Sequence, residues 1–353
     1  MPQNLVPLSK RKKLWPLILF FVFIFSAVLF FSLYRISFKK VKDVVTNQTL
    51  GEAVPFKEMT VPYLRSRAYD SRLGELSFYE KGSNYTSYLT NFSSDGLRVD
   101  GLLTVPDGQI PKEGWPAIIF VHGYIPPTQY VTTEKYVTYV DYLARNGFVV
   151  FKIDLRGHGN SEGEPGGGYY GSDYIVDTLS AREALINSDF VHPKNIGFWG
   201  HSMAGNVVLR SFAARPDTPA VVIWAGAVYS YVDQRKYGIN DNSYRPPSSS
   251  VRQQSRRRDL FEKVGSPSAS STFWQEVAPT NYLNDLKGAI AVHHALDDEV
   301  VDIGYSRDLM SLLDKTKVPH EFYTYSTGGH NIEGPSFSLA MQRTVDFFNT
   351  YLK

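Results

Sequence analysis

The sequence of 353 residues contains no cysteine. Disulfide bonds, thiolate metal sites and a cysteine nucleophile are therefore excluded. A chain without thiols suits an oxidising compartment but does not require one. Histidine is also scarce, because the chain holds only eight. Few residues can therefore act as a general base near neutral pH.

Acidic residues are absent from the first 42 residues, which contain eight Lys or Arg. Within this segment Leu14–Tyr34 runs for 21 residues without a charge. At about 1.5 Å rise per residue, such a helix spans the roughly 30 Å hydrocarbon core of a bilayer. We predict a basic N-terminal tail over 1–13 and a single-pass membrane anchor over 14–34. A cleaved signal peptide is the alternative, although no Ala-x-Ala-like site follows the apolar run.

The two flanks of this apolar run carry four Lys or Arg each, so their count does not set the orientation. We expect the short basic tail inside and the large domain on the extracytoplasmic side. The rest of the chain holds 29 basic and 35 acidic residues, and this mild excess of acid argues against a nucleic-acid partner. Hydrophobic residues make up 43% of the chain, which is enough for a sizeable core.

The chain downstream of the anchor divides into a polar juxtamembrane connector over 35–82 and one domain over 83–353. Asp95-Gly96 between two alternating segments predicts a β-hairpin. Short apolar runs then alternate with helix-period segments, which predicts a mostly parallel sheet with helices on both faces. The predicted strands are 117–121, 148–153, 196–199, 220–224, 289–292 and 321–325. The predicted helices are 134–146, 173–187, 203–214, 305–315 and 337–352.

One connection, residues 226–283, is unusually long and is expected to form a cap over the carboxyl edge of the sheet. It contains a cluster of arginines, which either forms a solvated face or binds an anionic substrate or lipid head group. The solvated face is favoured. The members of this cluster are Arg252, Arg256, Arg257 and Arg258.

A lone serine, Ser202, lies between small residues at the end of the predicted strand in "IGFWGHSMAGN". Gly200, Ala204 and Gly205 permit a sharp strand-to-helix turn and close helix packing. Such a turn presents the hydroxyl at a helix N-terminus, where backbone N–H groups converge. The alternative is an ordinary Gly-rich turn with an incidental serine. We predict that Ser202 is a nucleophile.

A serine hydroxyl needs a base to accept its proton, and the base needs a carboxylate to orient it. His330 in "YSTGGHN" follows the last predicted strand, which is the place of the base in α/β hydrolases. "AVHHALDDEVVD" supplies the acid after the preceding strand. Asp297 is first after that strand in a D-x-x-V spacing and is favoured, with Asp298 as the alternative.

The oxyanion formed by serine attack needs two or more preorganised donors. The N–H of Met203, directly after the nucleophile, is the first candidate. The second is Tyr124 in the loop "HGYIPP", through its N–H or its phenol. His122, His158 and Arg156 are interpreted as structural residues of this loop and of "DLRGHGNSEG".

These motifs occur in the order VHGY, DLRGHGNSEG, GHSMAG, HHALDDEVV and GGH. In this respect residues 83–353 resemble the α/β-hydrolase superfamily, and more narrowly the catalytic domain of the prolyl oligopeptidase family of serine peptidases. The resemblance implies Ser202 as nucleophile, Asp297 as acid and His330 as base. The sequence departs from the family at Ala204 and His294, where glycine is usual, at Val301, where proline is frequent, and in lacking room for a β-propeller.

The expectation is a membrane-anchored serine hydrolase that cleaves a small peptide or an acyl ester through an acyl-enzyme, with no metal or organic cofactor. The family likeness favours a peptidase over a carboxylesterase or lipase-type enzyme. A catalytically silent hydrolase fold that acts as a binding module is the alternative from another class. Proline specificity does not carry over from the family.

Overall fold

The computed structural model describes residues 55–166, 168–240 and 250–353. The predicted anchor over 14–34 and most of the connector lie outside these residues. In the part of the chain that is described, no helix is both long and apolar enough to cross a membrane.

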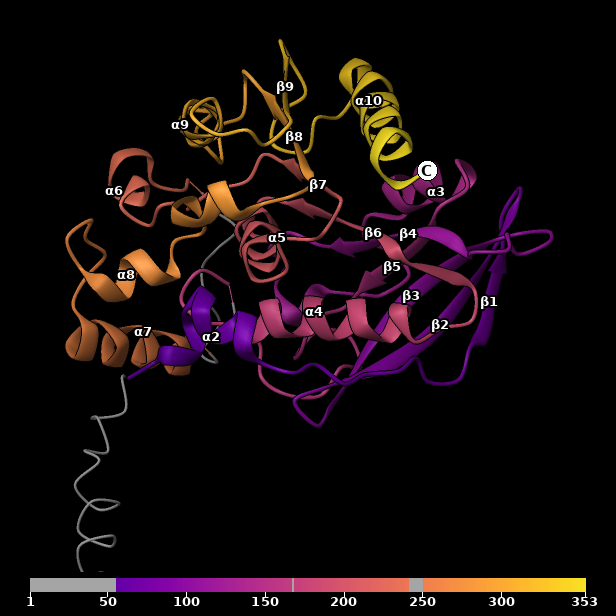
Figure 1. The fold of residues 1–353 in the computed structure, drawn as a ribbon, viewed down its shortest axis with the longest axis horizontal. Helices are drawn as coiled ribbons and strands as arrows, with labels where there is room; N and C mark the ends of the chain where they lie inside the picture. The colour runs from indigo at the N-terminus through magenta and orange to yellow at the C-terminus, as the bar shows by residue number, and fades with distance from the viewer. Residues whose placement is uncertain (1–54, 167, 241–249) are drawn as a thin grey trace, which may run out of the picture. The chain divides into compact units, whose positions relative to one another are not determined.

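A nine-stranded sheet runs through the described body, in the order β1-β2-β3-β5-β4-β6-β7-β8-β9 (Figure 1). Neighbouring strands from β1 to β3 and on to β5 are antiparallel, whereas β5, β4, β6, β7, β8 and β9 all run parallel. The predicted mostly parallel sheet is therefore confirmed. The strands are β1 (Ser77–Lys81), β2 (Tyr85–Ser94), β3 (Leu97–Pro106), β4 (Trp115–Val121), β5 (Val149–Ile153), β6 (Val191–His201), β7 (Ala220–Trp224), β8 (Ala289–Ala295) and β9 (His320–Tyr325).

The predicted hairpin is formed by β2 and β3, which pair Ser94 with Leu97 across a two-residue turn. Both turn residues have positive φ, 55° at Asp95 and 76° at Gly96. This conformation matches the twist of the strands and is favoured by an Asp-Gly pair.

Helices cover both faces of the sheet. Side chains of α3 and α10 pack in one core cluster, and those of α4, α5 and α9 pack in the other. Figure 1 shows α3 beside α10, with α4 and α5 adjacent on the opposite face. Every residue of α5 is buried, so this helix lies in the centre of the body. The longer helices are α3 (Val137–Arg145), α4 (Asp173–Ile186), α5 (Met203–Ala214), α7 (Ser250–Val264), α9 (Gly304–Leu313) and α10 (Pro335–Leu352).

The segment before β1 differs from the polar connector predicted over 35–82. Its short helices η1 (Lys57–Met59) and α2 (Val61–Ser66) bury Met59 and Leu64 in the core. Arg210 of α5 donates to the carbonyl of Met59 at 2.6 Å. Pro55–Lys353 accordingly forms one compact unit, which begins before the predicted boundary at residue 83. The apolar residues here are too few and too widely spaced to give a periodic signal.

The predicted cap folds into the helices α6 (Asp233–Tyr237), α7 and α8 (Thr272–Val277). The described arginines of its cluster make contacts within the chain. Arg256 donates to Asp173 at 2.6 Å, and the guanidinium of Arg257 lies 4.6 Å from the ring centroid of Tyr170. These contacts attach α7 to the start of α4. The side chain of Arg252 lies outside the described residues.

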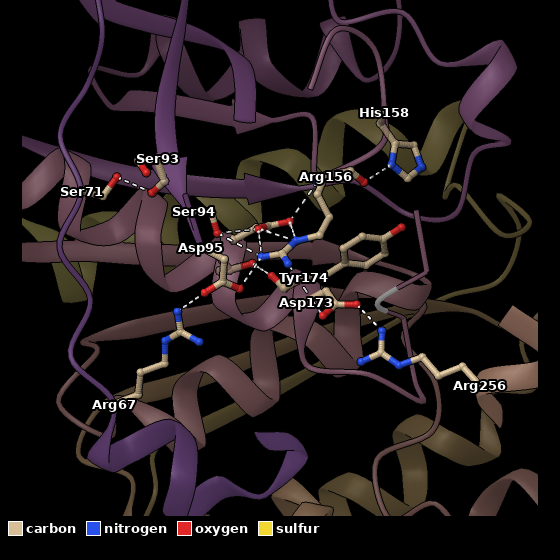
Figure 2. A network of polar contacts seen from close by, with 12 residues as sticks. Arg67, Ser71, Ser93, Ser94, Asp95, Arg156, His158, Asp173, Tyr174 and Arg256 are labelled. Atoms are coloured by element: carbon tan, nitrogen blue, oxygen red, sulfur yellow. Dashed lines mark hydrogen bonds and ion pairs between the residues drawn. The ribbon is translucent and has the colours of Figure 1, made fainter. Parts of the chain in front are cut away.

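The loop after β5 is held by a buried ion pair between Arg156 and Asp177 of α4. Figure 2 shows the guanidinium of Arg156 close to Asp95 and Asp173. Arg156 Nη2 lies 2.7 Å from Asp177 Oδ1 and 3.0 Å from Asp95 Oδ2 at the hairpin turn. The side chain of Asp177 is 0% exposed and that of Arg156 9%. Arg156 is therefore structural, as predicted, and connects the hairpin to α4.

Replacing Arg156 with methionine is expected to destabilise the fold by about 3–5 kcal/mol, because it leaves the carboxylate of Asp177 buried and unpaired. The matched control is Arg145→Met, which removes an exposed i,i+4 pair with Asp141 that contributes less than about 1 kcal/mol. The midpoint of urea-induced unfolding measures both. Equal midpoints for the two variants would contradict the structural role of Arg156.

Candidate active site

Ser202 lies in the turn between β6 and α5, at the carboxyl edge of the parallel sheet. Its backbone has φ 55° and ψ −120°, a strained conformation for a residue with a side chain. Ser202 N donates to the carbonyl of Trp224 at the end of β7, and Ser202 O accepts from Gly205 N, both at 2.9 Å. The turn is thus fixed from both sides, as in a nucleophile elbow.

The small residues around Ser202 are required by space. A Cβ on Gly200 would lie 2.7 Å from the carbonyl oxygen of Ala204, and one on Gly205 would lie 2.7 Å from Cα of Gly226. Both distances are shorter than the usual separation of non-bonded atoms in a packed protein, so a larger residue would clash at either position. The sharp turn and close helix packing expected from the sequence are therefore confirmed.

A pocket of about 1140 Å³ opens at this edge of the sheet. It is lined by both Ser202 and His330, together with Gly123 and Tyr124 of the loop after β4. The structure therefore brings the predicted nucleophile, the predicted base and one predicted oxyanion residue to a single cavity. The remaining lining residues are Ile125, Glu134, Lys135, Tyr136, Tyr139, His201, Ile239, Asn240, Glu299, Val300, Asn331 and Glu333.

His330 follows β9 in a loop turned by Gly328 and Gly329, which have φ 140° and 59°. Its Nδ1 lies 2.9 Å from Oδ2 of Asp298. With an ionised carboxylate as acceptor, Nδ1 carries the proton and Nε2 is left as the basic nitrogen. This is the tautomer that a general base needs.

Asp298 is surrounded by donors. Its Oδ1 accepts from the N–H groups of Val300 and Val301 at 2.9 and 3.0 Å, and its Oδ2 lies 3.2 Å from Nε2 of His294. Burial alone would raise the pKa of Asp298, but the hydrogen bonds from His294 and His330 outweigh it and hold the pKa well below its usual range. Asp298 is therefore a fixed anion at neutral pH, and its contribution to stability is lost only as the pH falls toward the folded-state pKa.

The choice of Asp297 as the orienting acid is corrected by this geometry. Asp297 accepts from the backbone N–H groups of Gly328 and Gly329 at 3.2 and 2.8 Å, and not from the imidazole. It anchors the loop that carries His330, whereas Asp298 contacts the ring. The D-x-x-V spacing did not separate them, because both Asp297–Val300 and Asp298–Val301 satisfy it.

The hydrogen bonds around Ser202 bear on which backbone N–H groups are candidates for the oxyanion donors. Met203 N is the first N–H of α5, and the first N–H groups of a helix have no partner within it. The N–H of Gly123 is occupied, because it donates to the hydroxyl of Tyr136 at 3.1 Å. Tyr124 follows Gly123 in the same loop and lines the pocket with Ser202, and the roles of Met203 and Tyr124 stay predictions.

His122 and His158 both contact the backbone of the loop that carries Tyr124, since Nε2 of His158 lies 3.3 Å from the carbonyl oxygen of Ile125. His122 contacts the carbonyls of Gly123 and Asp154, and its ring lies 4.5 Å from that of Tyr130. Burial lowers the pKa of His122 to about 3, so its ring is neutral. Their interpretation as structural residues agrees with these contacts. Among the described residues, no three His, Asp or Glu side chains are grouped as around a metal ion.

The fold and this pocket can be compared with known proteins. The model of the prolyl oligopeptidase family matches residues 135–353, which is more than half of the chain. The chain belongs to the prolyl oligopeptidase family. The matched range contains the serine turn, both aspartates and the histidine loop, and membership of this family makes the protein a hydrolase.

Among curated proteins, polyketide transferase claH of Penicillium crustosum is 27% identical over 146 residues. This match covers 41% of this prolyl oligopeptidase family member and 46%, less than half, of the relative. The relative's activity is therefore not transferred.

Two solved structures share the fold at low sequence identity. Acetyl xylan esterase 1 from Thermoanaerobacterium sp. JW/SL YS485 has a TM-score of 0.56 and 20% identity, covering 83% of this chain and 93% of that one. A puromycin-hydrolysing peptidase of Mycobacterium tuberculosis has a TM-score of 0.60 and 18% identity, covering 77% and 40%. At these identities the likeness establishes the α/β-hydrolase fold of the family member and no more.

Proposed function

We propose that the protein is a serine hydrolase that cleaves an amide or ester bond through an acyl-enzyme, with Ser202, His330 and Asp298 as its triad. The observation that carries the proposal is the contact between His330 Nδ1 and Asp298 Oδ2 beside a pocket that Ser202 also lines. That contact sets the tautomer in which Nε2 accepts a proton.

The proposed reaction has two halves. Ser202 Oγ attacks the substrate carbonyl carbon while its proton moves to Nε2 of His330. The N–H groups of Met203 and Tyr124 would donate to the oxyanion, and His330 then returns the proton to the leaving amine or alkoxide. Water repeats the sequence on the acyl-enzyme, releasing the acid and restoring the serine hydroxyl. Asp298 stays ionised throughout and stabilises the imidazolium.

The family supports a serine peptidase as the first candidate, with a small peptide as substrate. A carboxylesterase is the second candidate, favoured by the likeness that covers 93% of an acetyl xylan esterase. A peptidase and a carboxylesterase would use the same proposed triad. They differ in the leaving group, since an amine must be protonated as it departs whereas a nitrophenolate leaves without a proton.

The test is to measure kcat/KM of the full chain on p-nitrophenyl esters and p-nitroanilides that share one acyl group, with Ser202→Ala as the control. A peptidase is expected to turn over anilides as well as esters, and both activities are expected to disappear in Ser202→Ala. Turnover of esters alone would establish the second candidate. Failure to hydrolyse any substrate or to react with a fluorophosphonate would support the silent binding module and overturn the proposal.

We further propose that the segment 14–34 anchors the hydrolase in a membrane, with its domain on the extracytoplasmic side. The 21 uncharged residues between basic flanks support this. The full chain is expected to stay with membranes after alkaline carbonate washing and to leave them only with detergent. A protease added to intact cells should then digest the domain. Release by carbonate would overturn the anchor, and protection from protease would overturn the orientation.

A further inference from the structure

Three hydrogen bonds cross the candidate site from one side to the other. Gly123 N donates to the hydroxyl of Tyr136 at 3.1 Å, Tyr136 Oη lies 2.7 Å from His201 Nδ1, and His201 Nε2 lies 2.9 Å from the carbonyl oxygen of His330. They connect the loop after β4, the residue before α3, the residue before Ser202 and the histidine loop. We call this chain of bonds the Tyr136–His201 relay.

The direction of every bond in the relay is determined. A carbonyl oxygen can only accept, so His201 Nε2 must carry a proton and donate to His330 O. Burial lowers the pKa of His201 to about 3, so the ring is neutral at physiological pH and its Nδ1 is an acceptor. Tyr136 Oη must then donate to Nδ1. Burial raises the pKa of Tyr136 above its usual value, which keeps that proton in place.

The packing around the relay leaves little freedom. The rings of His201 and His330 have centroids 4.6 Å apart. A Cβ on Gly123 would lie 2.8 Å from Tyr136 Oη and 3.0 Å from His201 Nδ1, so the loop approaches as closely as glycine permits. Tyr136 itself is held at φ 60°, a costly conformation for a non-glycine residue that surrounding contacts must maintain.

The two ends of the relay are the two groups whose separation matters for the proposed reaction. One end fixes Gly123, next to the proposed oxyanion donor Tyr124. The other fixes the main chain of His330, whose ring is the proposed base. Both groups act on the same tetrahedral carbon bound to Ser202, so their relative position must hold to about 0.5 Å. His201 adjoins the nucleophile and thus connects all three.

We infer that Tyr136 and His201 are positioning residues, which set the oxyanion loop and the base loop at the separation that acyl transfer requires. The inference rests on the proposed function. Neither residue exchanges a proton with the substrate. Their effect is on the placement of Tyr124 N–H and of His330 Nε2 relative to Ser202 Oγ.

The decisive variant is Tyr136→Phe, which removes one oxygen and frees Gly123 N–H and His201 Nδ1 together. Its kcat on a p-nitrophenyl ester is expected to fall about 10- to 100-fold, the cost of a misplaced reacting group, with KM changed less than about threefold. Tyr142→Phe is the matched control, because this hydroxyl in the adjoining helix α3 donates to exposed Gln342 at 3.2 Å, and the variant should equal wild type.

Two further comparisons distinguish positioning from a purely structural role. His201→Gln keeps a terminal N–H donor and is expected to retain more activity than His201→Leu. In the double variant Tyr136→Phe/His201→Gln, kcat is expected to be no more than a few-fold below that of the worse single variant, because each change breaks the same chain of bonds.

The outcomes separate the inference from the proposed function. If wild type hydrolyses the ester but Tyr136→Phe matches it in kcat, or if the losses multiply in the double variant, the relay does not position the site. A lowered unfolding temperature with unchanged kcat would equally overturn it. If wild type itself neither hydrolyses the ester nor reacts with a fluorophosphonate, it is the proposed function that fails.

Discussion

Asp298→Asn is expected to lower kcat about 10⁴-fold without unfolding the protein, because the amide favours the wrong tautomer of His330 and does not stabilise the imidazolium. The 2.9 Å contact between His330 Nδ1 and Asp298 Oδ2 leads to this expectation. Backbone amides of Val300 and Val301 still have an acceptor in asparagine, so the loop is expected to keep its fold. Single-turnover and steady-state rates on an activated ester measure the effect.

Asp297→Asn is the matched control for that experiment, since it makes the same change one residue earlier. Asp297 contacts only the amides of Gly328 and Gly329 among the bonds described above, and asparagine keeps one acceptor for them. Its kcat is expected to stay within about tenfold of wild type. If Asp297→Asn were the inactive variant and Asp298→Asn the active one, the assignment of Asp298 as the acid that orients His330 would be wrong.

Ser202 and His330 form the pair that exchanges a proton in the proposed reaction, and removing either side chain is expected to lower kcat further still. Ser202→Ala and His330→Ala should each lower kcat by about 10⁶-fold, because neither residue performs acyl transfer without the other. The double variant should be no slower than either single variant. This non-additivity is the kinetic signature of two residues that act as one unit.

The result that would contradict the pairing is a double variant whose loss equals the product of the two single losses. Substantial residual activity in His330→Ala alone would point to another base. His201 adjoins Ser202 in the chain and lines the same pocket, but both of its ring nitrogens are used in the relay and burial lowers its pKa to about 3.

Much of the fold could be predicted because the strands and helices of this sheet have strong local patterns. The predicted apolar runs of β4 to β8 are buried in the sheet, so they read as continuous hydrophobic segments. The turn at Ser202 was predictable for a similar reason, since only small residues fit at Gly200 and Gly205. These signals lie within a few residues of the features they specify.

The errors fall where contacts are long-range or where two residues share one local pattern. Asp297 and Asp298 satisfy the same spacing, and only the path of the loop through Val300 and Val301 decides which carboxylate faces His330. The relay was missed because Tyr136 and His201 are 65 residues apart and no short motif joins them. The packing of Met59 against α5 likewise depends on a contact across 151 residues.

The most direct measurement is the site of covalent labelling by a fluorophosphonate, mapped by mass spectrometry of peptides from the full-length protein. We expect one stoichiometric adduct on Ser202, absent from Ser202→Ala and formed far more slowly in His330→Ala. Labelling of a different residue, or equal labelling of wild type and Ser202→Ala, would contradict it.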